Sequence, residues 1–207
     1  SNKYLSFVIL ICLYFFIPAK DTWGQELNNL RQYYPINQQN ADYIFVVDRS
    51  GSMRPYWSHV VNSITPIIQV LPEGDYVSVL GFDSECSSIV MPRAITESSK
   101  NELIDDIQLL NSPNGQYTDL YESLNKTLDE INRPESNRLN FLYYFTDFKN
   151  EPPYYSDWRN SGSLERLHDK YTNVITNSDR LLKSYAIQLP LSNDAGRDYR
   201  EFSNLIN

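Results

Sequence analysis

Residues 43–53 have the sequence Tyr-Ile-Phe-Val-Val-Asp-Arg-Ser-Gly-Ser-Met. The first five residues form an unbroken apolar run rich in β-branched and aromatic side chains, which predicts a strand buried on both faces of a sheet. This strand ends at Asp48, and Ser50 and Ser52 follow it at every second position. Since strands buried on both faces are typical of parallel sheets covered by helices, the run indicates an α/β fold with polar chemistry at a strand end.

The rest of the chain alternates between strand and helix patterns. Helices are predicted where apolar residues recur three and four positions apart, and strands where short apolar runs are bounded by turn residues. The pattern predicts a doubly wound, mostly parallel sheet of Rossmann-like type, with helices on both faces and one antiparallel edge strand, residues 87–91. The other predicted strands are 43–47, 76–82, 141–145 and 184–189, and the predicted helices are 55–71, 99–110, 120–131, 164–175 and 199–206.

Two of these helices have capping residues at their predicted starts. Ser99 followed by Glu102 matches a capping box, and Asp119 with Glu122 matches the start of the next helix. We therefore expect the first of these helices to begin at Ser99 and the second directly after Asp119.

The amino-terminal residues 1–24 differ in composition from the rest of the chain. Lys3 precedes an almost unbroken apolar run, residues 4–17, and Pro18 ends it, which is the layout of a secretory signal peptide. About 14 apolar residues are fewer than the roughly 20 needed to cross a bilayer. We expect cleavage before Gln25, with Ala19 as a second candidate position, and an uncleaved signal anchor is the alternative.

Three segments follow from this division. Residues 1–24 are the expected signal peptide, residues 25–41 a polar lead-in, and residues 42–207 a single domain. Because the last predicted helix ends with the sequence, where a doubly wound order would lead into another strand, we expect the natural chain to continue.

Composition narrows the possible partners and metals. The 207 residues include 18 Lys and Arg against 26 Asp and Glu, a net charge of −8, and no segment gathers the basic residues. Binding to nucleic acid or to an anionic membrane surface is therefore not expected. Two Cys and two His are too few and too scattered for a zinc site or a disulfide framework. Any metal here would be a hard ion held by oxygen.

Oxygen-bearing residues follow the predicted strands and loops at places that should meet. Ligands of open α/β sheets bind beyond the carboxyl ends of the strands, and Asp48, Ser50, Ser52, Thr118 and Asp147 all fall there. Hydroxyl and carboxylate oxygens suit magnesium, manganese or calcium. An ion held mainly by neutral hydroxyls keeps much of its electrophilic character, so it can accept a carboxylate from a partner.

This set of residues resembles a known family. The pattern Asp48-x-Ser50-x-Ser52, followed by Thr118 and Asp147, is similar to the metal-ion-dependent adhesion site of von Willebrand factor type A (vWA) domains, and the resemblance covers residues 42–207. It implies one divalent cation, magnesium first and manganese or calcium as alternatives. The two serines and the threonine would bind it directly, and the two aspartates directly or through water.

Each of these residues also has a purely structural interpretation. Asp48, Ser50 and Ser52 could cap a helix, as could Thr118, and Asp147 could pair with Lys149. Phe148 departs from the family, which often has a small residue there. The residues expected to rim the site are Tyr117, Phe148, Tyr154, Tyr155 and Trp158, with packing in the core as the alternative for each.

We expect an exported, cation-dependent protein-binding module that captures an acidic side chain of a partner, in the periplasm, at the cell surface or outside the cell. We do not expect an enzyme, because Ser50 stands where phosphotransfer would need a second aspartate and no Gly-x-Ser-x-Gly motif is present. The alternatives are a structural domain stabilised by its metal, or the docking module of a larger enzyme or transport assembly. Membrane contact is expected only through an uncleaved amino-terminal segment.

Overall fold

The computed structural model describes residues 11–12, 40–132, 138–178, 181–188 and the single positions 198, 200 and 202. Within these, the strands form one sheet in the order β1-β6-β5-β2-β3-β4, and every neighbouring pair is parallel except β3 with β4. This confirms the predicted mostly parallel sheet with an antiparallel edge. The strands are β1 (Ile11–Cys12), β2 (Ala41–Asp48), β3 (Tyr76–Phe82), β4 (Cys86–Ala94), β5 (Leu139–Thr146) and β6 (Leu181–Gln188).

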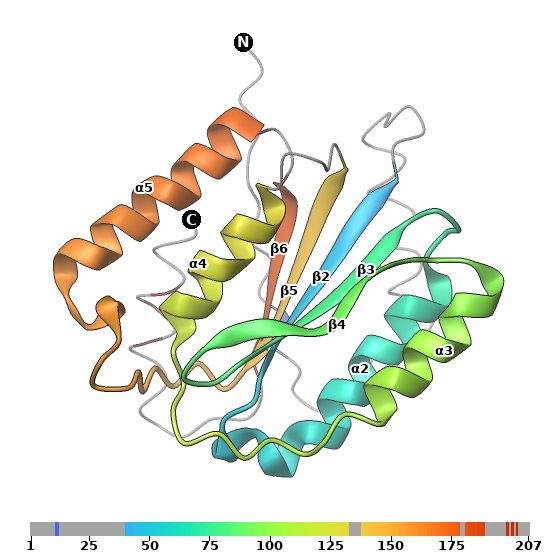
Figure 1. The fold of residues 1–207 in the computed structure, drawn as a ribbon, viewed down its shortest axis with the longest axis horizontal. Coiled ribbons are helices and arrows are strands. Elements are labelled where there is room, and N and C mark those ends of the chain that lie inside the picture. The colour runs from blue at the N-terminus through green and yellow to red at the C-terminus, as the bar shows by residue number, and fades with distance from the viewer. Residues whose placement is uncertain are drawn as a thin grey trace.

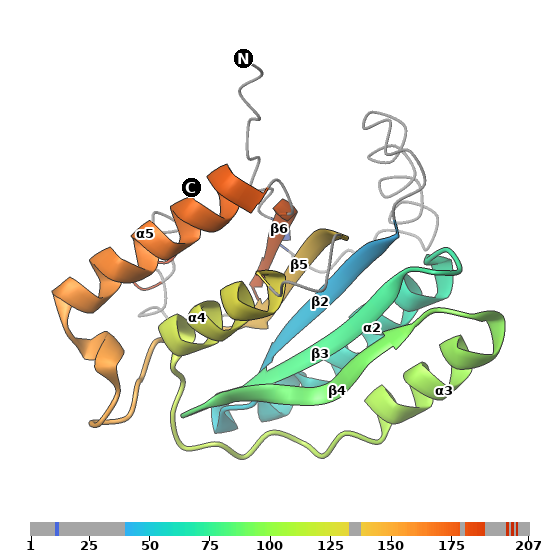
Figure 2. The ribbon, with the colours of Figure 1, turned by 45° about the horizontal axis from the view of Figure 1, so that its top comes forward.

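Helices cover both faces of the sheet, as Figures 1 and 2 show. Helices α2 (Trp57–Val70) and α3 (Glu97–Gln108) lie on one face, and α4 (Leu120–Ile131) and α5 (Ser161–Ser178) on the other. None of the helices described is both long enough and apolar enough to span a membrane. There are also two short 3-10 helices in the described residues, η1 (Gly51–Tyr56) and η2 (Asp157–Arg159). Helix η1 comes shortly after β2, and η2 lies further along the chain after β5.

The central strand β2 divides the apolar residues into two cores. Phe45 and Val47 pack with α2 and α3, whereas Ile44 and Val46 pack with α4 and α5. Successive side chains of a strand point to opposite faces, so an unbroken apolar run fills both cores at once. The prediction that this run is buried on both faces is confirmed.

The helix predicted to begin at Ser99 begins earlier. Thr96 is its N-cap: the Thr96 hydroxyl accepts from the Ser99 backbone N–H at 3.1 Å, and Ser99 Oγ accepts from the Thr96 N–H at 2.8 Å. Ser99 is therefore the third helical residue of a capping box and not its first member, so the predicted box with Glu102 was wrong. The Ser99 hydroxyl also donates to the Ala94 carbonyl at 2.8 Å, which ties it to the end of β4.

Other elements also differ in extent; β2, β5, α5 and β6, for example, begin two or three residues before their predicted starts. The helix predicted from residue 55 is preceded by η1, and its α-helical part starts at Trp57. Strand β4 continues through Pro92 because it lies at the sheet edge, where its pairing with β3 is irregular between Val77 and Val79. Residues 11–12, inside the predicted signal peptide, form β1 beside β6. Positions 198, 200 and 202 are helical, and the rest of the helix predicted over 199–206 lies outside the described residues.

Candidate functional site

The site begins where β2 ends, at Asp48. This carboxylate is fully buried, and each of its oxygens accepts a hydrogen bond: Oδ1 from the Ser50 N–H at 2.8 Å, and Oδ2 from the Thr146 hydroxyl at 2.7 Å. The hydroxyls of Ser50 and Ser52 lie 3.0 Å apart, with Ser50 buried and Ser52 exposed. The every-second-residue spacing thus brings a carboxylate and two hydroxyls to one turn.

Backbone hydrogen bonds join this turn to the segment that carries Thr118. The Gly51 N–H donates to the Gly115 carbonyl at 2.8 Å, and the Gly115 N–H donates to the Arg49 carbonyl at 2.9 Å. Thr118 follows three residues later and is buried, at 2% exposed. The pairing therefore fixes the position of the Thr118 segment beside the Asp48 turn.

The third segment follows β5. Asp147 is the first residue after this strand and is 8% exposed, and its Oδ1 accepts from the Lys149 backbone N–H at 3.0 Å. Thr118 and Glu151 exchange backbone hydrogen bonds of 3.0 and 2.8 Å, which joins the loop after β5 to the segment before α4. All five predicted site residues therefore lie on three adjoining segments at the carboxyl edge of the sheet.

Burial raises the pKa of Asp48 to about 7, because the charged form loses its hydration. The hydrogen bonds from Ser50 and Thr146 lower this pKa, and the nearby charge of Asp147 raises it. Within the described residues, Asp48 forms no ion pair with a Lys or Arg side chain. The fold therefore holds a buried carboxylate that a bound cation would compensate.

The purely structural interpretations fit only some of these residues. Ser50 occupies the N-cap position of η1 but makes no side-chain capping hydrogen bond. Asp119 does cap α4, as predicted, by accepting from the Glu122 N–H at 3.1 Å. The ammonium of Lys149 pairs with Glu151 at 2.7 Å. Capping therefore accounts for Asp119 but not for the hydroxyl of Ser50.

Over the part of the chain that the structure describes, no three His, Cys, Asp or Glu side chains are grouped as a metal site. The predicted site contains only two carboxylates and relies on three hydroxyls, a donor set suited to a hard cation. The donors therefore fit such an ion, while a complete metal-ion-dependent adhesion site stays a prediction.

Phe148 does not lie on an exposed rim. Its side chain is fully buried and packs against Phe202, with the ring centroids 5.7 Å apart. Its backbone has a φ of 58°, a left-handed conformation that turns the ring inward, and its N–H donates to the Thr146 hydroxyl at 3.0 Å. The rim prediction for Phe148 was wrong, because its ring is buried in the core against Phe202.

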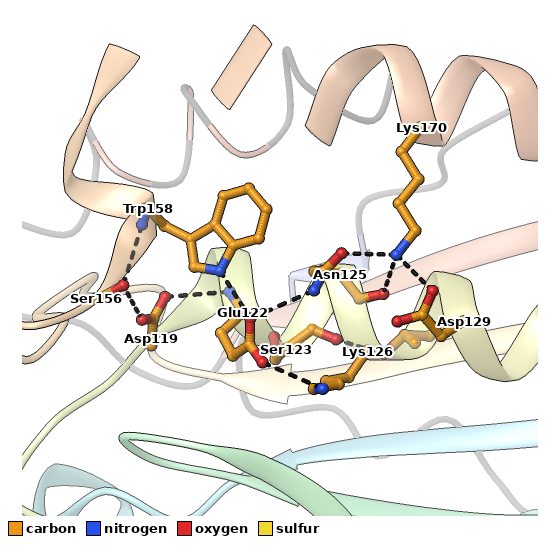
Figure 3. A network of polar contacts seen from close by, with 10 residues as sticks. Asp119, Glu122, Ser123, Asn125, Lys126, Asp129, Ser156, Trp158 and Lys170 are labelled. Carbon is orange, nitrogen blue, oxygen red and sulfur yellow. Dashed lines mark hydrogen bonds and ion pairs between the residues drawn. The ribbon is translucent and has the colours of Figure 1, made fainter. Parts of the chain in front are cut away.

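The other four aromatic residues differ in exposure. Tyr154 and Tyr155 are 81% and 57% exposed, whereas Tyr117 and Trp158 are half-buried. The Trp158 indole N–H donates to Glu122 Oε2 at 2.7 Å, which fixes the indole against α4 (Figure 3). Trp158 therefore holds the loop after β5 in place, and the two tyrosines are the exposed aromatic residues of that loop.

Two residues of the site were not predicted from the sequence. Thr146 binds Asp48 through its hydroxyl, and Gly115 lies where an added Cβ would approach the Asp83 Cβ to 2.5 Å. The sequence holds a weak signal for Thr146, which directly precedes Asp147 at a strand end. It holds none for Gly115, whose close neighbour is 32 positions away.

Thr146→Val tests the role of this hydroxyl. The change keeps the side-chain shape but removes both a hydrogen bond to a buried carboxylate and the acceptor of the Phe148 N–H, so we expect a loss of about 1.5–3 kcal/mol in the free energy of unfolding and a weaker response to divalent cations. Thr127→Val is the matched control, because the hydroxyl of this equally buried threonine contacts Ser123 and Tyr144 instead. Thermal unfolding with and without magnesium measures both effects. A full cation response in Thr146→Val would contradict the assigned role.

Sequence comparison identifies the family. The sequence profile of the von Willebrand factor type A domain matches residues 43–149, more than half of the chain, so the chain belongs to this family. Domains of this family are generally non-catalytic and often mediate protein–protein interaction. No curated protein matches the chain by sequence.

Solved structures share the fold. A conserved hypothetical protein, BatB, from Bacteroides thetaiotaomicron is 13% identical with a TM-score of 0.53, and the match covers 80% of this chain and 98% of that one. Proximal thread matrix protein 1 from the mussel byssus is 12% identical with a TM-score of 0.55, over 81% of this chain and 46% of that one. A von Willebrand factor type A protein from Catenulispora acidiphila is 14% identical with a TM-score of 0.50, over 81% and 42%. These identities establish the fold alone.

Proposed function

We propose that this vWA domain is an exported binding module that holds one divalent cation, magnesium first among the candidates, and captures an acidic side chain of a protein partner. The cation ligands are Asp48, Ser50, Ser52, Thr118 and Asp147. One observation carries the proposal: the fold brings these five residues onto three adjoining segments around a fully buried carboxylate that has no ion pair among the described residues.

A divalent cation bound there would supply an open coordination position to a carboxylate of the partner. The chain's own residues prepare that position. Asp48 is oriented by donors on both of its oxygens, and the Ser50 and Ser52 hydroxyls face each other at 3.0 Å. The hydroxyls and carboxylates of these segments serve as cation ligands in this proposal, so the proposed function is binding and not catalysis.

The cation is tested by thermal unfolding of the full chain in magnesium, manganese, calcium or chelator. A cation at 100 times its dissociation constant adds about 2.7 kcal/mol to the free energy of unfolding. Asp48→Ala should remove this gain. Ser52→Ala should weaken it while the fold is kept, because Ser52 is exposed, and Ser58→Ala, at an exposed serine of α2, should leave it unchanged. An identical cation response in all four proteins would overturn the site.

Export is part of the same proposal and depends on residues 1–24. The mass of the mature protein from its natural host tests it, since cleavage before Gln25 leaves a polypeptide that begins at residue 25. A full-length mature protein associated with membranes would support the signal anchor instead.

A further inference from the structure

Tyr154 and Tyr155 form an exposed aromatic pair. They are 81% and 57% exposed, and their rings meet edge to face with centroids 5.2 Å apart and an interplanar angle of 84°. Most other large aromatic side chains of the described part are buried in the two cores. Two tyrosines held together in solvent therefore need an explanation other than folding.

The loop that carries this pair is held at both ends beside the candidate cation site. It leaves the protein body at Glu151, whose backbone pairs with that of Thr118. It returns at Ser156, whose hydroxyl donates to the carboxylate of Asp119 (Figure 3). Four residues separate these anchors, and consecutive Cα atoms are about 3.8 Å apart. The tyrosine backbone therefore stays within a few residues' reach of Thr118.

The loop is also stiff. Two of its four residues, Pro152 and Pro153, have a fixed φ angle, and the Ser156 N–H donates to the Pro153 carbonyl at 3.0 Å. The Trp158 bond to Glu122 fixes the far side of the loop to α4. Helix α4 is held to α5 in turn, because Lys170 contacts both Asn125 and Asp129 (Figure 3). A partner that binds the pair would lose little free energy in ordering it.

The charges around the pair favour an apolar contact. Lys149 and Glu151 neutralise each other at 2.7 Å, and the exposed Asp157 and Arg159 carry opposite charges two residues apart. These four side chains therefore add no net charge beside the rings. The net charge of −8 repels an acidic partner. Burial of an apolar side chain against the two rings would therefore add affinity that a single carboxylate contact does not provide.

We propose that Tyr154 and Tyr155 form a second contact of the same binding site, which packs an apolar side chain adjacent to the acidic residue that a protein partner presents. This inference rests on the proposed function. It names the partner as a segment in which an aspartate or glutamate has a large apolar neighbour in sequence.

Short peptides test this partner chemistry. The probes are acetyl-Gly-Asp-Phe-Gly-amide and acetyl-Gly-Phe-Asp-Gly-amide, with acetyl-Gly-Asp-Gly-Gly-amide as reference, titrated against the full chain in magnesium and followed by NMR. At least one phenylalanine peptide should bind about five to ten times more tightly than the reference, as one aromatic contact provides. The preference should disappear in the double variant Tyr154→Ser/Tyr155→Ser and persist in Met91→Ser, where an exposed side chain of β4 is removed.

The outcomes separate the two proposals. Cation-dependent binding with equal affinity for all three peptides overturns the aromatic contact and leaves the proposed function standing. Retention of the preference in the double variant also overturns it. Failure of every peptide to bind in magnesium overturns the capture of an acidic side chain, and the aromatic contact with it. Unchanged magnesium stabilisation of the double variant confirms that its fold and cation site are intact.

Discussion

Gly115→Ala is expected to lower the free energy of unfolding by about 3 kcal/mol, at the upper end of the range for overpacking, and to abolish the response to divalent cations. A Cβ at this position would lie 2.5 Å from the Asp83 Cβ, 2.8 Å from Asp83 Oδ2 and 3.0 Å from the Arg49 carbonyl oxygen. Carbon atoms pack at about 3.5–4.0 Å. The neighbouring residues cannot easily move away, because Asp83 accepts a hydrogen bond from the Glu85 N–H and the Arg49 carbonyl accepts one from the Gly115 N–H. The segment that carries Thr118 must therefore move away from the Asp48 turn.

The matched control is Gly162→Ala. An added Cβ there meets nothing within 4 Å, and the residue lies in α5, where alanine is favoured over glycine. Thermal unfolding with and without magnesium should show unchanged or slightly raised stability and a full cation response. In the double variant Gly115→Ala/Asp83→Gly, loss of the Asp83 Cβ should restore part of the stability. Wild-type behaviour of Gly115→Ala alone would show that this contact does not position Thr118.

The fold was predictable where one local signal acts without competition. Strand β3 and helix α4 have the predicted bounds because a turn precedes the strand and Asp119 caps the helix. The start of α3 was not predictable, since Thr96 and Ser99 both have the sequence of a capping residue. The choice between them depends on the hydrogen bond from Ser99 to Ala94, a contact with the end of β4 that a local pattern does not contain.

The candidate site likewise has residues that could be predicted from the sequence and others, Phe148 among them, that could not. Its five oxygen-bearing residues could be predicted because each follows a strand or precedes a helix, and topology brings such places together. Phe148 could not, because its burial depends on a left-handed backbone and on Phe202, 54 positions away. Among the described residues it is the one non-glycine with positive φ.

Asp48→Asn is expected to raise the stability of the cation-free protein and to remove most of the stabilisation that a cation gives. Without cation, the wild-type fold buries a carboxylate whose pKa is raised from 3.8 to about 7. The folded state therefore binds more protons than the unfolded state between these values, so stability falls as pH rises from about 4 to 7 and stays low above it. The shift corresponds to a cost on the order of 4 kcal/mol at pH 8.

Asparagine avoids this cost and keeps most of the contacts. Its carbonyl oxygen can accept from the Ser50 N–H, and its amide can donate to the Thr146 hydroxyl oxygen, although that oxygen already accepts from Phe148. In chelator at pH 8 we therefore expect Asp48→Asn to be more stable than the wild type by about 2–3 kcal/mol, the charge cost less about one hydrogen bond. Near pH 4 the two proteins should converge.

In saturating magnesium the difference in stability between the two proteins should disappear or reverse. The wild type gains about 2.7 kcal/mol in the free energy of unfolding at 100 times the dissociation constant, whereas the variant gains little. Chemical denaturation at pH 4 and pH 8, each with chelator and with magnesium, measures all four states. A variant less stable than the wild type at pH 8 in chelator would mean that the charge of Asp48 is already compensated within the chain. A cation would then have no buried charge to balance, and the argument for a metal ligand at this position would fail.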